Sequence, residues 1–283
     1  MDPRQALLEC FPDLADEPVT LVESGLDSVV LDVAGVWIVR VPRRPNIEAN
    51  MVAEAALLAE IADRLPVPVP RPELSSSAGV RAMLYRKLPG TGVDEHLTGA
   101  DRLELAGRLG EFLGELHAFP AERVKEVGVR AYDAAAWHEG LQTFYSDARR
   151  SAFPFLAADE RRRATDFIER RLEDDTNVEF TLMHGDLEPQ HILCDGGQVT
   201  GVIDWTDARV GDPAVDLAWV VHGTDREFAD AVLDRYPGGD PTLLERARFY
   251  YRIVPWHVLI FGVAEGREDL IASGLRGVRK RLD

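Results

Sequence analysis

Cysteine is scarce in this sequence of 283 residues, which contains only Cys10 and Cys194. Two cysteines are too few for a disulfide framework, and these two lie too far apart for a Cys-X-X-Cys metal or redox motif. The sequence therefore excludes a disulfide-stabilised scaffold and predicts a protein of a reducing compartment.

Positive charge is also in short supply. Lysine and arginine together number 32 against 49 aspartates and glutamates, which gives a net charge of −17 at pH 7. A nucleic-acid-binding protein needs a basic surface to neutralise phosphates, so nucleic acid is not expected as the main partner. The acidity leaves room for a local basic pocket that binds a small phosphate ligand, and it suits a cationic substrate.

Long hydrophobic runs are missing as well. The longest strongly apolar stretch without a formal charge runs from Ile253 to Ala264, which is too short to cross a bilayer. The first residues lack the basic segment followed by an apolar one that marks a secretory signal. With 46% hydrophobic and 29% charged residues, the sequence predicts a globular cytoplasmic protein with no membrane partner. No feature predicts an oligomeric state.

About the first 90 residues have the pattern of a β-rich lobe with one helix. Runs rich in β-branched residues predict strands at Val19–Glu23, Val29–Val33, Val36–Val41 and Val80–Leu88. The helix is expected at Ile47–Leu65, which is rich in Ala, Leu and Glu. Alternating prolines end it and impose an extended segment up to Pro72.

The rest of the chain changes to helical periodicity from about Ala100. Short apolar runs broken by Gly and Asp interrupt the helices between residues 180 and 203. The pattern predicts an α+β protein of two lobes. Residues 1–88 would form a small β-rich lobe with a connector, and residues 89–283 a larger helical lobe.

Polar residues gather in two short segments of the larger lobe. The first reads HGDLEPQH over residues 184–191, and the second begins at Asp204 after an apolar run. An Asp in a tight loop, a ligand-type residue five positions later and a second Asp at a strand end predict a site for Mg²⁺ and phosphate. In phosphoryl transfer one carboxylate accepts the hydroxyl proton, while others hold the metal ion.

The two segments, HGDLEPQH and GVIDWTDARVGDPAVDLA, resemble the catalytic and metal-binding segments of the aminoglycoside phosphotransferase family. The resemblance extends over most of the chain and implies a protein-kinase-like fold, with a nucleotide-binding lobe at 1–88. Within the family the chain is most similar to the macrolide 2′-phosphotransferases. That likeness rests on Gly25-Leu26-Asp27, on the strand around Arg40, and on His191, where most of the family carries Asn.

The resemblance assigns Asp186 as the catalytic base, which orients and deprotonates the acceptor hydroxyl. His191 and Asp204 would hold Mg²⁺. Because Mg²⁺ prefers oxygen ligands in octahedral geometry, His191 either binds the ion directly, binds it through a water or positions Asp186.

The resemblance also places a purine nucleotide, GTP or ATP, between the lobes. Arg40 would reach its phosphates and pair with Glu54, although the same two residues also fit a plain salt bridge within the lobe. The loop at 24–28 would cover the phosphates, with Ser28 as a hydroxyl donor. The connector from Tyr85 to Leu88 would receive the purine through its backbone.

The acceptor implied by the resemblance is the 2′-hydroxyl of a macrolide amino sugar. A macrolide is large and mostly apolar, with one basic group, so it needs an aromatic pocket with a nearby carboxylate. Asp207 is expected to meet the ammonium group, and Tyr251 and Trp256 to line the pocket, unless the late aromatic residues simply form core.

Three further polar residues fit bracing roles. Asp216, in the first turn of a helix, suits a structural carboxylate that supports the catalytic loop. His184 fits a buried hydrogen-bonding brace for the same loop, and His117 a satisfied core histidine.

Two other functions stay open. The first keeps the chemistry and changes the acceptor to an aminoglycoside or a small amino-alcohol, whose pocket should be densely acidic. The second is a catalytically silent nucleotide-binding module that regulates a partner. Both Asp186 and Asp204 are present, so silence would have to arise from His191 or from a blocked pocket.

Overall fold

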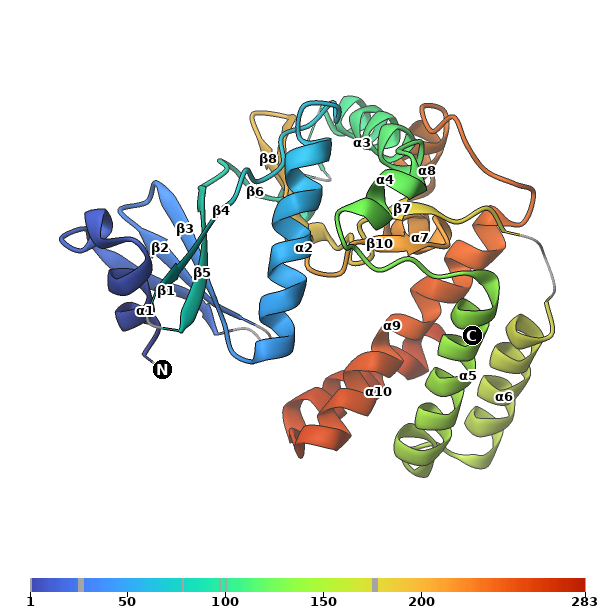
Figure 1. Ribbon diagram of the computed structural model, residues 1–283. Coiled ribbons are helices and arrows are strands. Elements are labelled where there is room, and N and C mark those ends of the chain that lie inside the picture. The colour runs from blue at the N-terminus through green and yellow to red at the C-terminus, as the bar shows by residue number, and fades with distance from the viewer. Residues whose placement is uncertain are drawn as a thin grey trace.

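An antiparallel sheet of five strands forms the centre of the N-terminal lobe (Figure 1). Its order is β1 (Val19–Ser24), β2 (Ser28–Val33), β3 (Trp37–Pro42), β5 (Val80–Arg86) and β4 (Glu73–Ser77). The computed structural model describes residues 2–24, 28–77, 79–96, 98–99, 101–174 and 178–282. The tip of the predicted phosphate-covering loop, residues 25–27, lies outside these ranges.

The two faces of the sheet follow the period-two alternation of the strands. Val29 and Val33 point to the face that α1 (Pro3–Cys10) covers. Ile38 and Met83 point to the opposite face, where they contact Met51 of α2 (Pro45–Ile61). The sheet is therefore a middle layer between two helices, and α2 faces the larger lobe (Figure 1).

The sequence predicts one helix and four strands here, and the described residues of the lobe form two α-helices and five strands. Helix α1 has only eight residues, too few for an apolar stripe to stand out. Strand β4 consists of Glu, Leu and three serines, and it pairs only with β5 at the sheet edge. Strands β2 and β3 are joined by a tight turn, in which Ala34 and Gly35 adopt positive φ and the N–H of Val36 donates to the carbonyl of Val33 at 3.1 Å.

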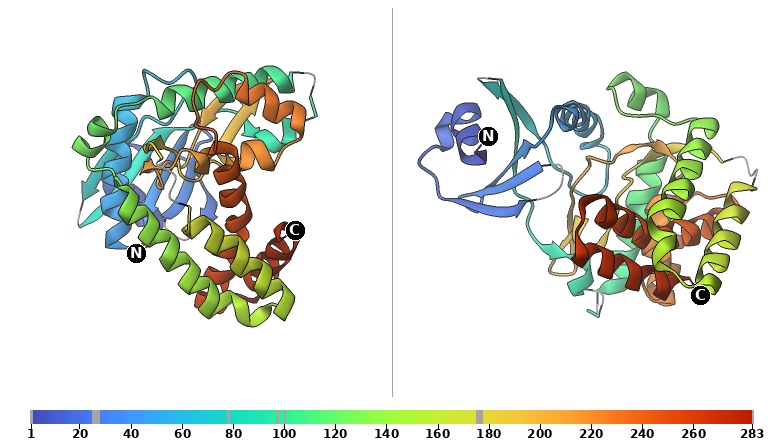
Figure 2. Two further views of the ribbon diagram at one scale, coloured as in Figure 1. Left: turned by 90° about the vertical axis from the view of Figure 1, so that its right-hand side faces the viewer. Right: turned by 90° about the horizontal axis from the view of Figure 1, so that it is seen from below.

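The larger lobe is mainly helical. Its helices are α3 (Arg102–His117), α4 (Ala121–Glu126), α5 (Ala134–Asp147), α6 (Ala158–Leu172), α7 (Ala214–His222), α8 (Arg226–Leu233), α9 (Leu243–Glu265) and α10 (Glu268–Arg281). Figure 2 shows α5, α6, α9 and α10 gathered at the end of this lobe. No helix among the residues described here is long and apolar enough to cross a membrane.

Two small sheets carry the polar segments between these helices. One has the order β6 (Thr91–Gly92), β8 (Ile192–Asp195), β9 (Gln198–Val202), and the other pairs β7 (Thr181–Met183) with β10 (Arg209–Gly211). Strand β6 follows the last N-terminal strand directly yet pairs with β8 of the larger lobe. The α+β, two-lobed architecture predicted from the sequence is thus confirmed.

Candidate active site

The hairpin of β8 and β9 brings the two polar segments together. Ile192 pairs with Val202, and the N–H of Ile203 donates to the carbonyl of His191 at 2.9 Å. This register leaves His191 and Asp204 side by side, with His191 Nε2 3.8 Å from Asp204 Oδ2. Asp204 adopts a positive φ of 62°, a conformation that is uncommon for a residue other than glycine.

Asp186 lies in the loop between β7 and β8 and touches the same histidine. His191 Nδ1 lies 2.7 Å from the backbone carbonyl of Asp186 and 3.5 Å from its carboxylate. Burial raises the pKa of Asp186 to about 6, although His191 opposes the shift, and the charges of Asp207 and Glu188 add to it. A carboxylate with this pKa is ionised at neutral pH and still basic enough to accept a hydroxyl proton.

The loop that carries Asp186 is held in place by Asp216, which is 0% exposed in the first turn of α7. Its carboxylate accepts the backbone N–H groups of His184 and Gly185, each at 2.8 Å. It also bonds His117 Nε2 at 3.1 Å, and His117 Nδ1 bonds the hydroxyl of Tyr236. These contacts give Asp216 and both histidines structural partners within the lobe.

Arg40 on β3 and Glu54 on α2 form a buried pair, 2.6 Å apart and 7% and 4% exposed. The same guanidinium reaches across to the larger lobe, where it lies 3.7 Å from Asp204 and donates to the hydroxyl of Thr206. Thr206 Oγ1 is also 3.2 Å from Glu54 and 3.1 Å from Asp204. Sequence reasoning missed Thr206, because a threonine two positions after a ligand-type Asp carries no signal of its own.

These contacts shift the pKa values of the Asp204 and Glu54 carboxylates in opposite directions. Burial would raise the pKa of Asp204, but the positive charge of Arg40, with His191, outweighs it and brings the pKa below its ordinary value. Burial dominates at Glu54 and raises its pKa, even though Arg40 acts in the opposite direction. Asp204 is therefore the carboxylate that stays ionised most readily.

The donor set of His191 and Asp204 fits a nucleotide-bound Mg²⁺. Because His191 Nδ1 faces a carbonyl oxygen, we assign its proton to Nδ1, which leaves the lone pair of Nε2 directed toward Asp204. Two electron-pair donors that face each other suit a cation between them. Within the described ranges no group of three His, Cys, Asp or Glu side chains surrounds such a point. That is adequate for Mg²⁺, which takes one or two protein ligands and completes its shell with phosphates and water.

The other residues expected to contact the nucleotide lie in the N-terminal lobe and the connector. Ser28 begins β2 and is 5% exposed, and its hydroxyl has no hydrogen-bond partner among the residues described. Tyr85 is buried on β5, and Leu88 packs against Gly201 of β9. The N–H of Lys87 already donates to the carbonyl of Val36 at 2.8 Å, so this connector amide is not free for a purine.

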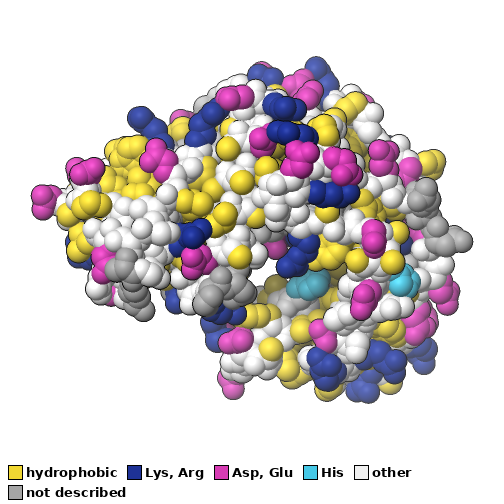
Figure 3. Space-filling view, viewed as in Figure 1, with side chains coloured by type: hydrophobic (Ala, Val, Ile, Leu, Met, Phe, Trp, Pro, Cys, Tyr) yellow, Lys and Arg dark blue, Asp and Glu magenta, His cyan; other side chains and the backbone are white. Residues whose placement is uncertain are grey.

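A cavity of about 630 Å³ opens beside Asp186 between α5 and α9. Figure 3 shows the molecule hollowed there, between the β-rich lobe and the C-terminal helices. Its walls are mostly apolar and aromatic, and charged side chains stand at the catalytic-loop side. The lining includes Trp137, Leu141, Phe144, Tyr250, Ile253, Val254, His257 and Val258, with Asp186, Glu188, Asp207 and Arg209 at the charged side.

The cavity contains one of the three residues expected to contact the acceptor. Asp207 lines it, whereas Tyr251 and Trp256 do not. Trp256 is 1% exposed and packs against Phe153, and Tyr251 stacks under the guanidinium of Arg281. The helical period explains the difference. The face of α9 toward the cavity carries positions 250, 253, 254, 257 and 258, and positions 251 and 256 point elsewhere.

Comparisons with known proteins agree with this geometry. The model of the phosphotransferase enzyme family matches residues 18–250. The viomycin phosphotransferase of Streptomyces vinaceus is 26% identical over 203 residues, 70% of this chain and 69% of that protein. A macrolide 2′-phosphotransferase from Brachybacterium faecium is 27% identical with a TM-score of 0.71, over 92% of this chain and 91% of that one. The GDP complex of aminoglycoside 2′-phosphotransferase-IIIa has a TM-score of 0.87 at 24% identity, over 98% and 96%.

Proposed function

Because the chain belongs to the phosphotransferase enzyme family, we propose that it transfers the γ-phosphoryl group of GTP or ATP to the 2′-hydroxyl of a macrolide amino sugar. The observation that carries this proposal is the acceptor cavity. Its walls on α5 and α9 are apolar and aromatic, and its carboxylates stand only at the side of Asp186.

This distribution of groups matches a large apolar acceptor with one cationic sugar. The lactone ring would pack against the helices, where apolar contact gives most of the affinity. The dimethylammonium group would lie near Asp207, and the neighbouring hydroxyl near Asp186. An aminoglycoside carries several amines and hydroxyls, for which the mostly apolar walls offer few hydrogen-bond partners.

Asp186 performs the proton transfer in this proposal. Its carboxylate orients the acceptor hydroxyl and accepts its proton as the oxygen attacks phosphorus in line. His191 fixes the loop by holding the backbone carbonyl of Asp186, and Asp216 holds the two preceding amides. Catalysis then depends on positioning and on charge neutralisation, since no second nucleophile is needed.

The nucleotide side of the site uses the residues that join the lobes. Arg40, aligned by Glu54 and Thr206, would contact the phosphates, and His191 and Asp204 would hold Mg²⁺. When bound, the ion neutralises charge on the phosphoryl oxygens. GTP as the preferred donor rests on the resemblance to macrolide enzymes.

An aminoglycoside acceptor is the second candidate. It is supported by the likeness to aminoglycoside 2′-phosphotransferase-IIIa in fold and by the net charge of −17, which favours polycations. A catalytically silent module is less well supported, because Asp186 and Asp204 are both present and both lie beside His191.

Mass spectrometry separates these functions. The purified protein with Mg²⁺ is incubated with GTP or ATP and with erythromycin, a cladinose-free macrolide or kanamycin. One transferred phosphoryl unit adds about 80 Da to the acceptor. We expect this gain on a macrolide and its loss in Asp186→Asn. A gain on kanamycin alone would replace the macrolide proposal with the second candidate, and retained nucleotide binding without any transfer would favour the silent module.

A further inference from the structure

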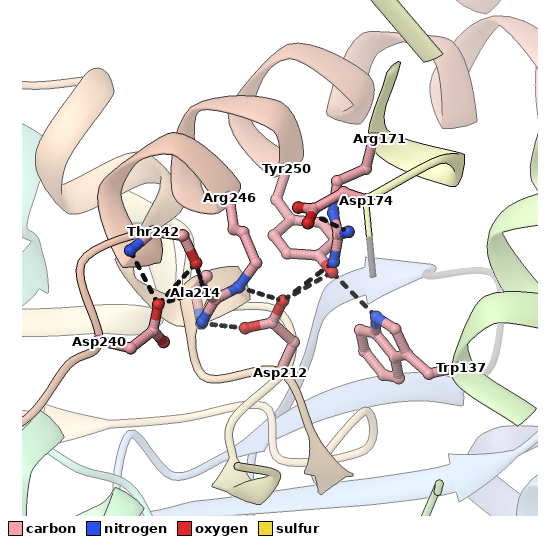
Figure 4. A network of polar contacts seen from close by, with 9 residues as sticks. All are labelled: Trp137, Arg171, Asp174, Asp212, Ala214, Asp240, Thr242, Arg246 and Tyr250. Atoms are coloured by element: carbon pink, nitrogen blue, oxygen red, sulfur yellow. Dashed lines mark hydrogen bonds and ion pairs between the residues drawn. The ribbon is translucent and has the colours of Figure 1, made fainter. Parts of the chain in front are cut away.

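A buried network of polar contacts lies behind the acceptor cavity (Figure 4). Its centre is Asp212, which follows β10 and is 0% exposed. One oxygen accepts the N–H of Ala214 at 3.1 Å, and the other accepts Arg246 Nε and the hydroxyl of Tyr250, each at 2.9 Å. Arg171 adds a charge 3.8 Å away. The carboxylate is thus fixed by four partners from three helices, α6, α7 and α9.

Tyr250 connects the buried Asp212 to Trp137 in the wall of the cavity. Trp137 Nε1 donates to the Tyr250 hydroxyl at 2.9 Å. An indole N–H can only donate, and the phenol has a single hydrogen. The direction is therefore settled: Trp137 donates to Tyr250, and Tyr250 donates to Asp212. Burial raises the pKa of Tyr250, with Asp212 adding to the shift, so the phenol keeps the hydrogen that the chain of bonds requires.

Packing restrains the indole of Trp137 on its other sides. Tyr132 and Phe180 meet it edge to face, at centroid distances of 5.4 and 5.5 Å. Gly211 lies directly beneath it, because a Cβ at this position would stand 2.6 Å from Trp137 Cζ3. A side chain at Gly211 would therefore push the indole toward the cavity, which Trp137 and Tyr250 both line together with Asp186.

We propose that Trp137 determines acceptor specificity by setting the width of the cavity, and that the Tyr250–Asp212 hydrogen bonds are the positioning device that holds it. The ligand class is an acceptor with an apolar ring face that packs against the indole. Asp212 also caps the start of α7 through Ala214, and α7 carries Asp216, which holds the catalytic loop. Asp212 thereby connects the wall of the cavity to helix α7, and α7 in turn supports the loop that carries Asp186.

Tyr250→Phe tests the positioning device, because it removes one hydroxyl and leaves Asp212 with Arg246 and Ala214. We expect the near-ultraviolet circular dichroism of Trp137, taken as a difference spectrum against Trp137→Phe, to weaken. The KM for the acceptor should rise about tenfold, which corresponds to about 1.4 kcal/mol for the lost hydrogen bond. The KM for the nucleotide should stay within about twofold, since no nucleotide contact changes.

Two further variants make the test specific. Gly211→Ala should lower kcat/KM most for the widest macrolide, because the displaced indole narrows the cavity. Tyr145→Phe is the matched control: Tyr145 lies on the same helix as Trp137, and its hydroxyl bonds Glu169 outside the cavity. In a double-mutant cycle, Trp137→Phe and Tyr250→Phe should raise the acceptor KM by less than the product of their separate effects.

The inference depends on the proposed function only for the identity of the acceptor. A wild-type protein that phosphorylates no macrolide would remove that function, whereas the dichroism of the unliganded protein would still report whether Tyr250 holds Trp137. An unchanged spectrum in Tyr250→Phe, an unchanged acceptor KM, or an equal rise in the nucleotide and acceptor KM values would each overturn the inference.

Discussion

At the scale of single residues, the proposed role of Asp186 as the base leads to a prediction about the pH dependence of the reaction. The base must be ionised to accept a proton, and burial raises its pKa to about 6 from an ordinary 3.8. We therefore expect kcat/KM to fall as the pH is lowered through about 6, with an acidic limb that reports this group in the free enzyme. Asp186→Asn should lower kcat by about 10³-fold or more and leave nucleotide affinity intact.

The pH–rate profile of the wild type and calorimetry of nucleotide binding to the variant are the measurements. Glu188→Gln is the control, since Glu188 also lines the cavity and changes the local charge. It should shift the acidic limb slightly without abolishing turnover. Near-normal turnover of Asp186→Asn would remove Asp186 from the role of base.

Thr206 offers a second prediction at this scale. Its hydroxyl accepts from Arg40 and has one hydrogen to give, yet two carboxylates, Glu54 and Asp204, lie within reach. Thr206→Val removes this hydrogen and leaves the buried Arg40 with an unpaired N–H. We expect affinity for Mg²⁺–nucleotide, measured by calorimetry, to fall about tenfold.

Thr206→Ser keeps the hydroxyl and should restore most of that affinity. The acceptor KM should be the same in both variants, because Thr206 does not line the acceptor cavity. Valine keeps the methyl group and loses only the hydroxyl, so an unchanged nucleotide affinity in Thr206→Val would show that the hydroxyl has no part in aligning Arg40.

At the scale of secondary-structure elements, the sequence predicts strands β1, β2, β3 and β5 and helix α2 well, because their apolar alternation and composition are strong. It misses β4 and α1, which are short and gain their order from the neighbours they pack against. Element bounds shift by a few residues, as the helix expected at 47–65 runs from 45 to 61.

The same contrast holds for the functional site. The segment from His184 to His191 and Asp204 are found by spacing, since ligand types at fixed offsets are a local signal. Thr206 reaches the site only through the register of the hairpin. The aromatic wall forms only where α5 and α9 lie on either side of the cavity. The helical period of α9, counted from Tyr250, places His257 on the same face as Tyr250 and places Trp256 on another face.

Helix α7 allows a prediction about the loop that it supports. Asp216→Ala would leave three donors, two of them backbone amides, without their acceptor in a dry environment. We expect the free energy of unfolding to fall by about 3 kcal/mol or more, with a large loss of kcat because the catalytic loop is released.

Asp225→Ala is the matched control, an aspartate that caps α8 by accepting from Phe228. The substitution should lower the free energy of unfolding by about 1 kcal/mol and leave kcat unchanged.

The dependence of stability on pH supplies a second check of the role of Asp216. Burial would raise the pKa of Asp216, but the hydrogen bond from His117 leads the contributions that bring it below 3.8. Its stabilisation is therefore present above that ordinary pKa and is lost as the pH falls through the folded value. Urea titrations at neutral and acidic pH should show a larger loss in the wild type than in Asp216→Ala, because the other carboxylates titrate in both proteins.

At the scale of the whole molecule, the two lobes meet through apolar packing, which joins Leu57 and Leu58 of α2 to the core of the larger lobe, and through charge. Arg40 belongs to the N-terminal lobe by its strand, yet it bonds Thr206 and lies beside Asp204 of the larger lobe. Composition and periodicity distinguish the lobes, but they do not show which residues join them. That junction depends on side chains 166 positions apart in the sequence.

The net charge of −17 leads to a prediction about both substrates. A cationic acceptor is drawn toward an acidic protein, whereas a nucleotide is repelled except close to Arg40. Added salt screens both effects, since the Debye length shortens to about 8 Å at physiological ionic strength. We therefore expect kcat/KM for the acceptor to fall a few-fold between about 20 and 300 mM KCl, with no such fall in kcat/KM for the nucleotide. Sucrose of equal osmolality, the control for a general effect of solute, should leave both kcat/KM values unchanged. If the two constants fell in parallel, the acidity of the surface would have no part in choosing the acceptor, and recognition would lie in the cavity alone.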